Sequence, residues 1–284
     1  MADFGYNQFL DWGTATSITM TTGRVTSGDM DTDSNPQHRE GIGAQDSIVG
    51  GELKPAGKFT FDPQYAAGGN VKTLLSYGLR SSFTSPSLTD LCFAGGILGN
   101  GKKHTGAKID SMGLKCSIGQ ALSVDLGWKS TLQAVAYATA PIATLTAATY
   151  EWFMGTCTVG SSSLLMQSFD VNVNNNVDYL YSLDVATSNK RFPDSLKVGS
   201  QVVTVTFDLL TYPGSSAESD LIADTLAVNI GASIVLASTD TLTITLSGGS
   251  RKSLSVPFQN SDGTVVYKLA LEFPKNQSGI IAIS

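Results

Sequence analysis

The sequence contains few charged residues. Asp, Glu, Lys and Arg make up 15% of its 284 residues, whereas an average soluble domain has roughly 25%. Serine, threonine, asparagine and glycine must therefore form much of the surface. The cores of protein interfaces are depleted in charge. The composition thus fits either a threonine-rich β protein or a protein whose surface is largely covered by copies of itself.

Basic residues are scarce as well, and they form no stripe along the chain. The formal net charge is −6. Proteins that hold nucleic acid through its phosphates need clustered lysine and arginine, so the sequence argues against that class. An acidic wall past which DNA slides without adhering is compatible with the charge.

The three cysteines, Cys92, Cys116 and Cys157, are an odd number at unrelated spacings, and no CxxC pair occurs. This usage is typical of a reduced protein in which cysteines are small core residues. No apolar run at the N-terminus is flanked by basic residues, and no stretch approaches 18 consecutive apolar residues. We therefore expect neither a signal peptide nor a membrane-spanning segment.

Catalytic signatures are missing. There is no GxSxG motif, and the two histidines, His38 and His104, are expected to be exposed polar residues rather than general bases. A pair of carboxylates for glycoside hydrolysis stays open, because its separation depends on the fold. The sequence predicts a protein that is not an enzyme, with no catalytic, cofactor-binding or metal-binding residues and no cofactor.

Two segments resemble ligand loops. In a predicted polar loop, Asp29, Asp31, Asp33 and Glu40 have the carboxylate spacing of an EF-hand calcium loop. Ser34 replaces the required glycine and neither flank is helical, so an ordinary solvated loop is the simpler interpretation and calcium is left open.

The segment Gly96–Lys103 contains GxxxxGK, but Lys103 replaces the magnesium-binding Ser or Thr and no helix follows. A tight hairpin or flexible loop is therefore expected there rather than a phosphate-binding loop.

One stretch, Gly50–Leu79, organises the chain. Phe59 and Phe61 alternate with polar residues before Pro63, which predicts a half-buried strand. After a glycine-rich break the spacing of apolar residues predicts a short helix near 71–78. Almost everything else has the pattern of β-strands.

A β-hairpin follows. Residues 111–118 and 122–129 alternate apolar with polar side chains on either side of Gly119–Gln120, which is typical of an antiparallel pair. At the C-terminus, strands are predicted at 242–246, 254–258 and 265–273.

The chain divides into a β domain at 1–137, a connector at 138–150 and a second β domain at 151–284, with a second helix expected near 216–226. Phe61-Asp62 and Phe207-Asp208 lie 146 residues apart, which favours a duplication. A strand is predicted at 169–173, with a turn at 174–176 and a return strand through Leu183. This segment matches the hairpin of residues 111–118 and 122–129 at an offset of about 57 residues and not 146. A duplication would then have a different order of parts in the two halves, and the alternative is that the matches are coincidental.

Several of these segments resemble one family. Residues 39–43, the glycine-rich approach, the FTFDP strand end and the helix ending LLSYGL resemble the tail tube proteins of long-tailed (siphovirus-type) bacteriophages. Residues 107–130 are similar to the hairpin that follows in that family. The resemblance covers 39–135 well and the remainder loosely.

The resemblance implies a mainly β fold, an antiparallel β-sandwich or barrel with one flanking helix, present as two tandem related domains. It implies a structural virion protein, assembled in the host cytoplasm into stacked rings that form a tail tube and deliver DNA. A trimer of tandem domains is the preferred ring and a hexamer the alternative. Loops 26–46, 95–106 and 211–219 would bind the next ring.

The implied partners are a tape-measure protein, tail-terminator and baseplate proteins, and DNA that passes without specific binding. Other functions stay open. The chain could be a decoration or tail-tip sandwich, or a tube protein whose second half decorates the outside. It could also be a carbohydrate-binding or adhesin module, for which Trp12, Trp128 and Trp152 are the large aromatic candidates.

Overall fold

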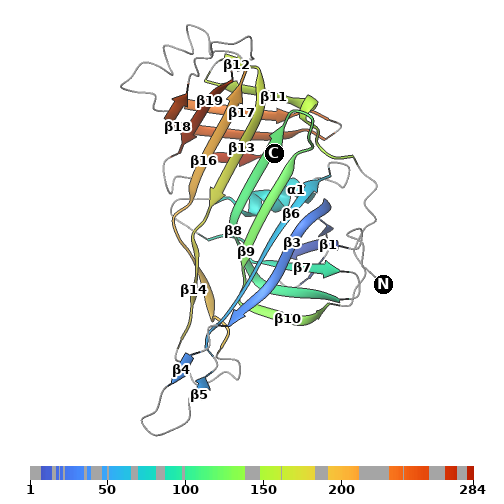
Figure 1. The fold of residues 1–284 in the computed structure, drawn as a ribbon, viewed down its shortest axis with the longest axis vertical. Coiled ribbons are helices and arrows are strands. Elements are labelled where there is room, and N and C mark those ends of the chain that lie inside the picture. The colour runs from blue at the N-terminus through green and yellow to red at the C-terminus, as the bar shows by residue number, and fades with distance from the viewer. Residues whose placement is uncertain are drawn as a thin grey trace.

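Antiparallel β-strands make up most of the described chain (Figure 1). The computed structural model describes residues 8–14, 17–18, 20–21, 23–34, 37–39, 47–49, 51–64, 70–80, 87–97, 100–137, 148–160, 162–182, 191–210, 230–238, 240–255, 266–273 and 280–284. The described strands form antiparallel, sandwich-like sheets that do not close into a barrel.

The elements of the first half are β1 (Gln8–Thr14), β2 (Met20–Thr21), β3 (Gly23–Ser34), β4 (Gln37–Arg39), β5 (Ser47–Val49), β6 (Leu53–Pro63), α1 (Asn70–Tyr77), β7 (Leu91–Ile97), β8 (Asn100–Ser117), β9 (Ser123–Lys129) and β10 (Leu132–Tyr137). Those of the second half are the 3-10 helix η2 (Trp152–Met154), β11 (Gly155–Val159), β12 (Ser162–Leu164), β13 (Met166–Asn174), β14 (Val177–Leu180), β15 (Ser195–Val198), β16 (Val202–Leu209), β17 (Ile230–Leu236), β18 (Leu242–Ser255), β19 (Tyr267–Glu272) and β20 (Ile281–Ile283).

The two halves have the same order of strand pairing. In the first half the order is β3-β6-β9-β8-β7-β1-β2, with β10 also on β8. In the second half it is β13-β16-β19-β18-β17-β11-β12, with β20 also on β18. The expectation that the parts are ordered differently in the two halves is therefore wrong: β13 takes the place of β3, not of the hairpin strand β8.

The long strands β8 and β18 each take part in two sheets. Residues 100–107 of β8 pair with β7, whereas residues 108–115 pair with β9. Similarly, residues 242–249 of β18 pair with β17 and residues 250–255 with β19. A β-bulge interrupts each strand close to the change of partner, at residues 109–111 of β8 and 251–253 of β18. Bulges bend a strand and increase its twist.

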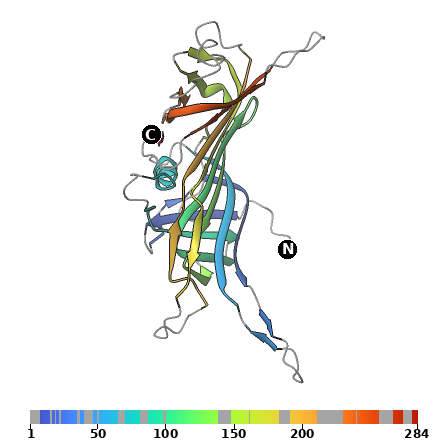
Figure 2. The ribbon, with the colours of Figure 1, turned by 90° about the vertical axis from the view of Figure 1, so that its left-hand side faces the viewer.

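The halves are joined through β13 and β8. These strands pair antiparallel over seven residue pairs, from Ser168 opposite Ser117 to Asn174 opposite Ser111. We call this pairing the internal junction. It produces an inner sheet of eight strands in the order β3-β6-β9-β8-β13-β16-β19-β18, with α1 to one side of it (Figure 2).

One hydrophobic core runs along the α1 side of the inner sheet and spans both halves. Leu74 and Leu75 of α1 are fully buried in it. Trp128 lies in the first half between Phe59 and Phe93, at ring-centroid distances of 5.7 and 4.1 Å. The division into two domains and a connector is not decided by this arrangement and stays a prediction.

Most strand and helix predictions are confirmed. The helix at 70–77 ends before Gly78, whose N–H donates to Leu75 O, as a helix C-terminus favours. The hairpin of β8 and β9, the half-buried strand β6, and strands β13 and β19 occupy the predicted segments. The second helix expected near 216–226 and most of the connector lie outside the described residues.

Four predictions are wrong. Residues 26–34 belong to strand β3, and 95–106 lie mostly in β7 and β8, so neither is a long polar loop. The tight hairpin expected at 96–103 is nevertheless confirmed, because Ile97 lies opposite Asn100. After β13 the chain does not return along it, because β14 pairs with β15. The separate strands expected at 242–246 and 254–258 are parts of one strand, β18, as far as the structure describes them.

Candidate assembly surfaces

The side of the inner sheet that faces away from the core is lined by small polar residues. We call it the polar face. Strand alternation places apolar residues on the core side and serine, threonine, asparagine or charged residues here. Its residues include Lys58, Thr60, Asp62, Ser111, Lys115, Ser123, Asp125, Asp170, Asn172, Thr204, Thr206, Asp208, Ser253, Ser255 and Lys268.

Several charges on the polar face have partners of opposite sign or hydroxyl partners. Asp125 accepts hydrogen bonds from Lys115 Nζ at 2.8 Å and from Thr60 Oγ1 at 2.6 Å. Partial burial opposes ionisation of Asp125, but the bonds from Lys115 and Thr60 outweigh it and its pKa is lowered. The hydrogen bond to Asp125 likewise raises the pKa of Lys115. Ser168 Oγ donates to Asp208 at 2.9 Å.

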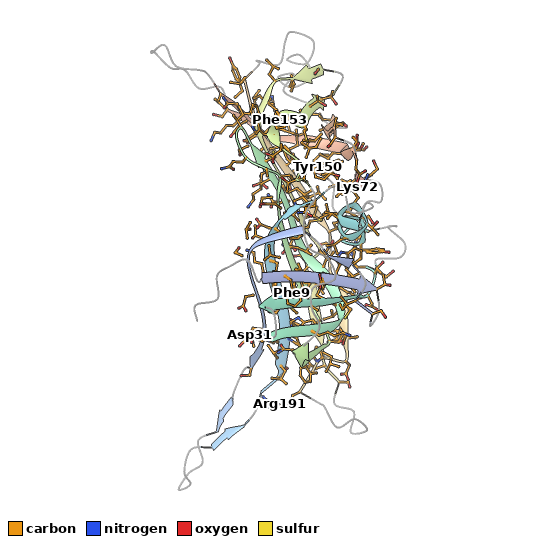
Figure 3. The ribbon with its side chains drawn as sticks, turned by 90° about the vertical axis from the view of Figure 1, so that its right-hand side faces the viewer. Phe9, Asp31, Lys72, Tyr150, Phe153 and Arg191 are labelled. Carbon is orange, nitrogen blue, oxygen red and sulfur yellow. The ribbon has the colours of Figure 1, made fainter. Side chains whose placement is uncertain are left out.

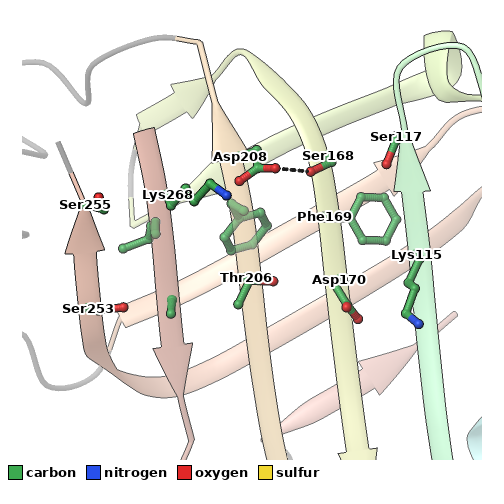
Figure 4. A pocket seen from close by; sticks show the side chains of 13 residues that line it. Lys115, Ser117, Ser168, Phe169, Asp170, Thr206, Asp208, Ser253, Ser255 and Lys268 are labelled. Atoms are coloured by element: carbon green, nitrogen blue, oxygen red, sulfur yellow. Dashed lines mark hydrogen bonds between the residues drawn. The ribbon is translucent and has the colours of Figure 1, made fainter. Parts of the chain in front are cut away.

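The polar face is hollowed over the second half. A shallow depression of about 560 Å³ is lined by residues of β8, β13, β16, β19 and β18 (Figure 4). Both lysines at its rim, Lys115 and Lys268, are accompanied by carboxylates on neighbouring strands, Asp170 and Asp208. The depression therefore has the mixed charge of the rest of the face, and it contains no group of three metal-ligating side chains among the described residues.

The inner sheet has two open edges in the described part of the chain. Strand β3 pairs with β6 on one side only. Residues 250–255 of β18 pair with β19 only. On β8, the equivalent side is the one covered by β13 at the internal junction. Unpaired N–H and C=O groups at such edges are templates for another strand.

The open edges carry opposite charges. Residues 27–34 of β3 contain Asp29, Asp31 and Asp33 and no basic residue, and all three aspartates are exposed. We call this segment the acidic edge. Residues 250–255 of β18 contain Arg251 and Lys252 and no acidic residue, and form the basic edge.

Partners within the chain lie near both edges. Lys102 Nζ is 3.3 Å from Asp31 Oδ1, and the pKa of Asp31 is lowered by a hydrogen bond from the Thr32 N–H and by Lys102. Lys252 Nζ is 3.6 Å from Glu272 Oε2 on the polar face, with both side chains well exposed. Exposed pairs of this kind contribute little to stability, so both edges keep charge available for a partner.

Two arms extend from one end of the molecule. The first continues β3 and β6 and carries the small β4-β5 hairpin, and the second contains β14 and β15 (Figure 1). They are joined by hydrogen bonds from Tyr179 Oη to Pro55 O (2.7 Å) and from Tyr181 Oη to Leu53 O (2.8 Å). Leu53 N–H also donates to Arg191 O at 2.6 Å.

Exposed apolar side chains gather at the opposite end, around the β8-β9 turn. Phe153 and Leu165 are 66% and 67% exposed, and Ile118 and Trp152 are also exposed. The backbone N–H groups of Ile118 and Trp152 donate to Gln167 O and Gln120 O, which ties η2 and β13 to the turn. Figure 3 shows Phe153 and Arg191 at opposite ends of the molecule. We call this group the apolar end.

His104 is a core residue, so the expectation of an exposed histidine is wrong for it. Its side chain is fully buried. Trp128 Nε1–H donates to His104 Nδ1 at 3.1 Å, and His104 Nε2 lies 3.2 Å from Gln133 Oε1. A neutral ring with its proton on Nε2 satisfies both bonds. Burial is the main reason that its pKa is lowered to about 4.

The motifs that resembled ligand loops do not form sites in the described part of the chain. Asp29, Asp31 and Asp33 alternate along a strand, while Glu40 and the side chain of His38 lie outside the described residues. Strand β8, not a helix, follows Gly96. The three cysteines are free and buried, as expected, and burial raises the pKa of Cys116 to about 11 and of Cys157 to about 12.

The aromatic candidates for a sugar-binding platform are mostly buried. Trp12 and Trp128 lie in the core, and Trp152 is 42% exposed. In the described part of the chain no helix has the length and apolarity needed to cross a bilayer.

The assembly surfaces are not evident from the sequence. The acidic edge has the composition of a loop, and no local pattern distinguishes Lys252 or Phe153. An alternation signal was present, because Asp29, Asp31 and Asp33 are separated by Met30 and Thr32, but aspartate is depleted in strands.

Comparison with known sequences gave one result for nearly the whole chain. The model of a family described as phage tail tube protein matches residues 5–274. A search of curated proteins found no match.

Proposed function

The chain belongs to the phage tail tube protein family, and from this premise we propose that three copies close into a ring and that rings stack into the tube. Membership makes the protein a structural component of the phage virion with a role in tail assembly. Ring closure, stacking and passage of DNA are the parts that we propose. The observation that carries them is the inner sheet with two open edges of opposite charge.

The shared strand order of the two halves supports a ring of three chains. We treat each half as one repeat of the tube wall, so that three chains supply six repeats. The internal junction joins two repeats within a chain, and the open edges would join repeats of neighbouring chains. Closure removes the exposed edges that otherwise promote aggregation.

The polar face would line the bore. Its small hydroxyl and amide side chains and its paired charges offer no cluster of lysine and arginine among the described residues. Contacts to phosphates give most of the non-specific affinity for DNA, so a bore of this kind would let DNA pass without adhering. The core side, with α1, would face outward.

Stacking would use the two ends of the molecule. The arms lie at one end and the apolar end at the other (Figure 3). Exposed apolar groups rimmed by polar residues mark interaction sites. The arms of one ring would therefore cover Trp152 and Phe153 of the next.

The remaining partners follow from the same role. We propose that the tube surrounds a tape-measure protein during assembly in the host cytoplasm, that terminator and baseplate proteins bind its ends, and that DNA later passes through it into the host.

Negative-stain electron microscopy of the purified protein tests the proposal. Concentration should produce filaments with a regular axial repeat and a stain-filled centre, and end views should average with threefold symmetry. A sixfold ring of whole chains would refute the stoichiometry alone. A protein that stays monomeric at high concentration would refute the tube.

A further inference from the structure

We propose that β3 of one chain pairs with residues 250–255 of β18 in the next chain in the register of the internal junction, and that charge selects this pairing. This inference rests on the proposed function and specifies the contact that closes the ring. We call the contact the external seam. Its geometry comes from the equivalence of the two halves.

The strand β18 can be aligned with β8 residue by residue. Leu114 lies opposite a residue of β9 that pairs on its other side with Phe61. Leu254 lies opposite a residue of β19 that pairs on its other side with Phe207. Because each phenylalanine belongs to a Phe-Asp step, Leu114 and Leu254 occupy equivalent positions. The side of β8 that contacts β13 therefore corresponds to the open side of β18.

The strand β3 can be aligned with β13 in the same way. Gly28 lies opposite the residue two positions before Phe61, and Val171 lies opposite the residue two positions before Phe207. Gly28 and Val171 are therefore equivalent. In the internal junction Val171 lies opposite Leu114. The external seam consequently places Gly28 opposite Leu254 of the next chain.

This register brings the charged residues together. On the polar face it pairs Ser27 with Ser255, Asp29 with Ser253 and Asp31 with Ser250. Lys252 stands in the β-bulge between the last two pairs, and its ammonium group already lies on the polar face beside Glu272. The seam thus gives Lys252 two carboxylates of the neighbouring chain, Asp29 and Asp31.

The internal junction provides a precedent for this arrangement. Lys115 of β8 contacts Asp125 of β9 in its own half at 2.8 Å and lies opposite Asp170 of β13 across the junction. In the external seam Lys252 takes this role, with Glu272 on its own side and aspartates on the other. Both contacts place one lysine between acids of two adjoining repeats.

Charge also disfavours the wrong assemblies. Two copies of β3 paired about a twofold axis at Asp31 would place Asp31 opposite Asp31 and Asp29 opposite Asp33. Two copies of the basic edge would bring Arg251 and Lys252 together. Like charges directly opposite one another destabilise strand pairs. Closed dimers through identical edges are therefore disfavoured, and the head-to-tail contact that forms rings is favoured.

Disulfide cross-linking tests the register. The variant Ser27→Cys/Ser255→Cys should form disulfides between chains after mild oxidation, because opposite residues have Cβ atoms about 5 Å apart. The covalent species should stop at three chains, because the proposed ring closes there. The control Ser27→Cys/Ser250→Cys is out of register by about 13 Å at roughly 3.3 Å per residue and should not cross-link. The native cysteines are buried and give little background.

Charge reversal tests the selection. Asp29→Lys and Lys252→Glu should each raise the protein concentration needed for assembly at least tenfold, and the two changes together should restore it to within about threefold of the unmodified protein. The matched control Asp90→Lys reverses an exposed charge just before β7, outside the two edges, the arms and the apolar end, and should leave assembly unchanged within that margin. Thermal unfolding of each monomer confirms that it is folded.

The outcomes separate the seam from the tube. Tubes that form while the Ser27/Ser255 pair fails to cross-link, or cross-links no better than the control, overturn the register and leave the tube in place. Normal assembly of both single charge variants overturns charge selection. If the unmodified protein forms no rings under any condition, the proposed function fails together with the seam.

Discussion

The strand β8 of the first half pairs with β13 along one side. In the equivalent strand of the second half, β18, residues 250–255 have no paired strand on that side in the described part of the chain. Leu114 is consequently fully buried, whereas Leu254 is only partly buried. The same order of strand pairing therefore occurs twice in one molecule, once with a neighbouring strand on this side and once without. The difference separates what each half needs to fold from what it would need to assemble in the proposed ring.

Alanine substitution at the two equivalent leucines gives the largest expected contrast. Leu114→Ala should lower the free energy of unfolding by about 3 to 4 kcal/mol, because it leaves a cavity in a closed core. Leu254→Ala should cost the monomer less than about 1 kcal/mol. Urea unfolding of both variants provides the measurement. Equal losses would show that the halves are closed to the same extent.

Acid should weaken the first half selectively. The pKa of His104 is about 4 in the folded protein against roughly 6.5 in the unfolded chain. The folded state therefore binds fewer protons between these values. The free energy of unfolding should therefore be unaffected by His104 above pH 6.5. It should fall as the pH falls below that value, by about 3 kcal/mol at pH 4.

Urea unfolding between pH 7 and pH 4, followed by tryptophan fluorescence, checks this prediction. The variant His104→Phe should lack the slope, and His38→Asn should keep it. A slope that survives in His104→Phe would assign the pH dependence to carboxylates instead.

Loss of the contact that α1 makes between the halves should lower the free energy of unfolding by less than the two preceding changes. Lys72 Nζ donates to Asp240 Oδ1 at 2.5 Å and to Thr241 O at 3.1 Å. Lys72→Met should cost about 1 kcal/mol, since the pair is partly buried and a charged hydrogen bond is lost. The exposed Lys58 of strand β6 supplies the control. Thermal unfolding of Lys58→Met should show almost no change.

The smallest effect on folding is expected at the apolar end. Phe153→Ser should change the free energy of unfolding by less than about 0.5 kcal/mol, because the ring is exposed. It should nevertheless shorten or abolish filaments, while rings persist. Normal filaments in electron micrographs of this variant would remove the apolar end from the stacking contact.

Local patterns in the sequence were sufficient for most elements and insufficient for their arrangement. Alternation around Phe59, Leu114 and Val171 identifies strands, and Asn70 with Gly78 brackets the helix. Pairing across long sequence separations, such as β8 with β13, leaves no local trace. The offset of about 57 was misleading because any two strands of period two match each other.

The acidic edge was misjudged for a physical reason. Asp29, Asp31 and Asp33 have low β propensity, and they are tolerated in β3 because they face away from the core while Gly28 makes room for Phe59. A Cβ at Gly28 would lie 2.3 Å from that ring. The buried hydrogen-bond network around His104 was equally invisible, since Gln133 and Trp128 reach it from two other strands.

The internal junction also changes how many molecules must meet. If the proposed ring were built from separate repeats, six molecules would have to associate, and the population of the ring would fall with a high power of dilution. With every second contact made inside a polypeptide, the proposed ring needs only three molecules, so its nucleation would begin at a lower protein concentration.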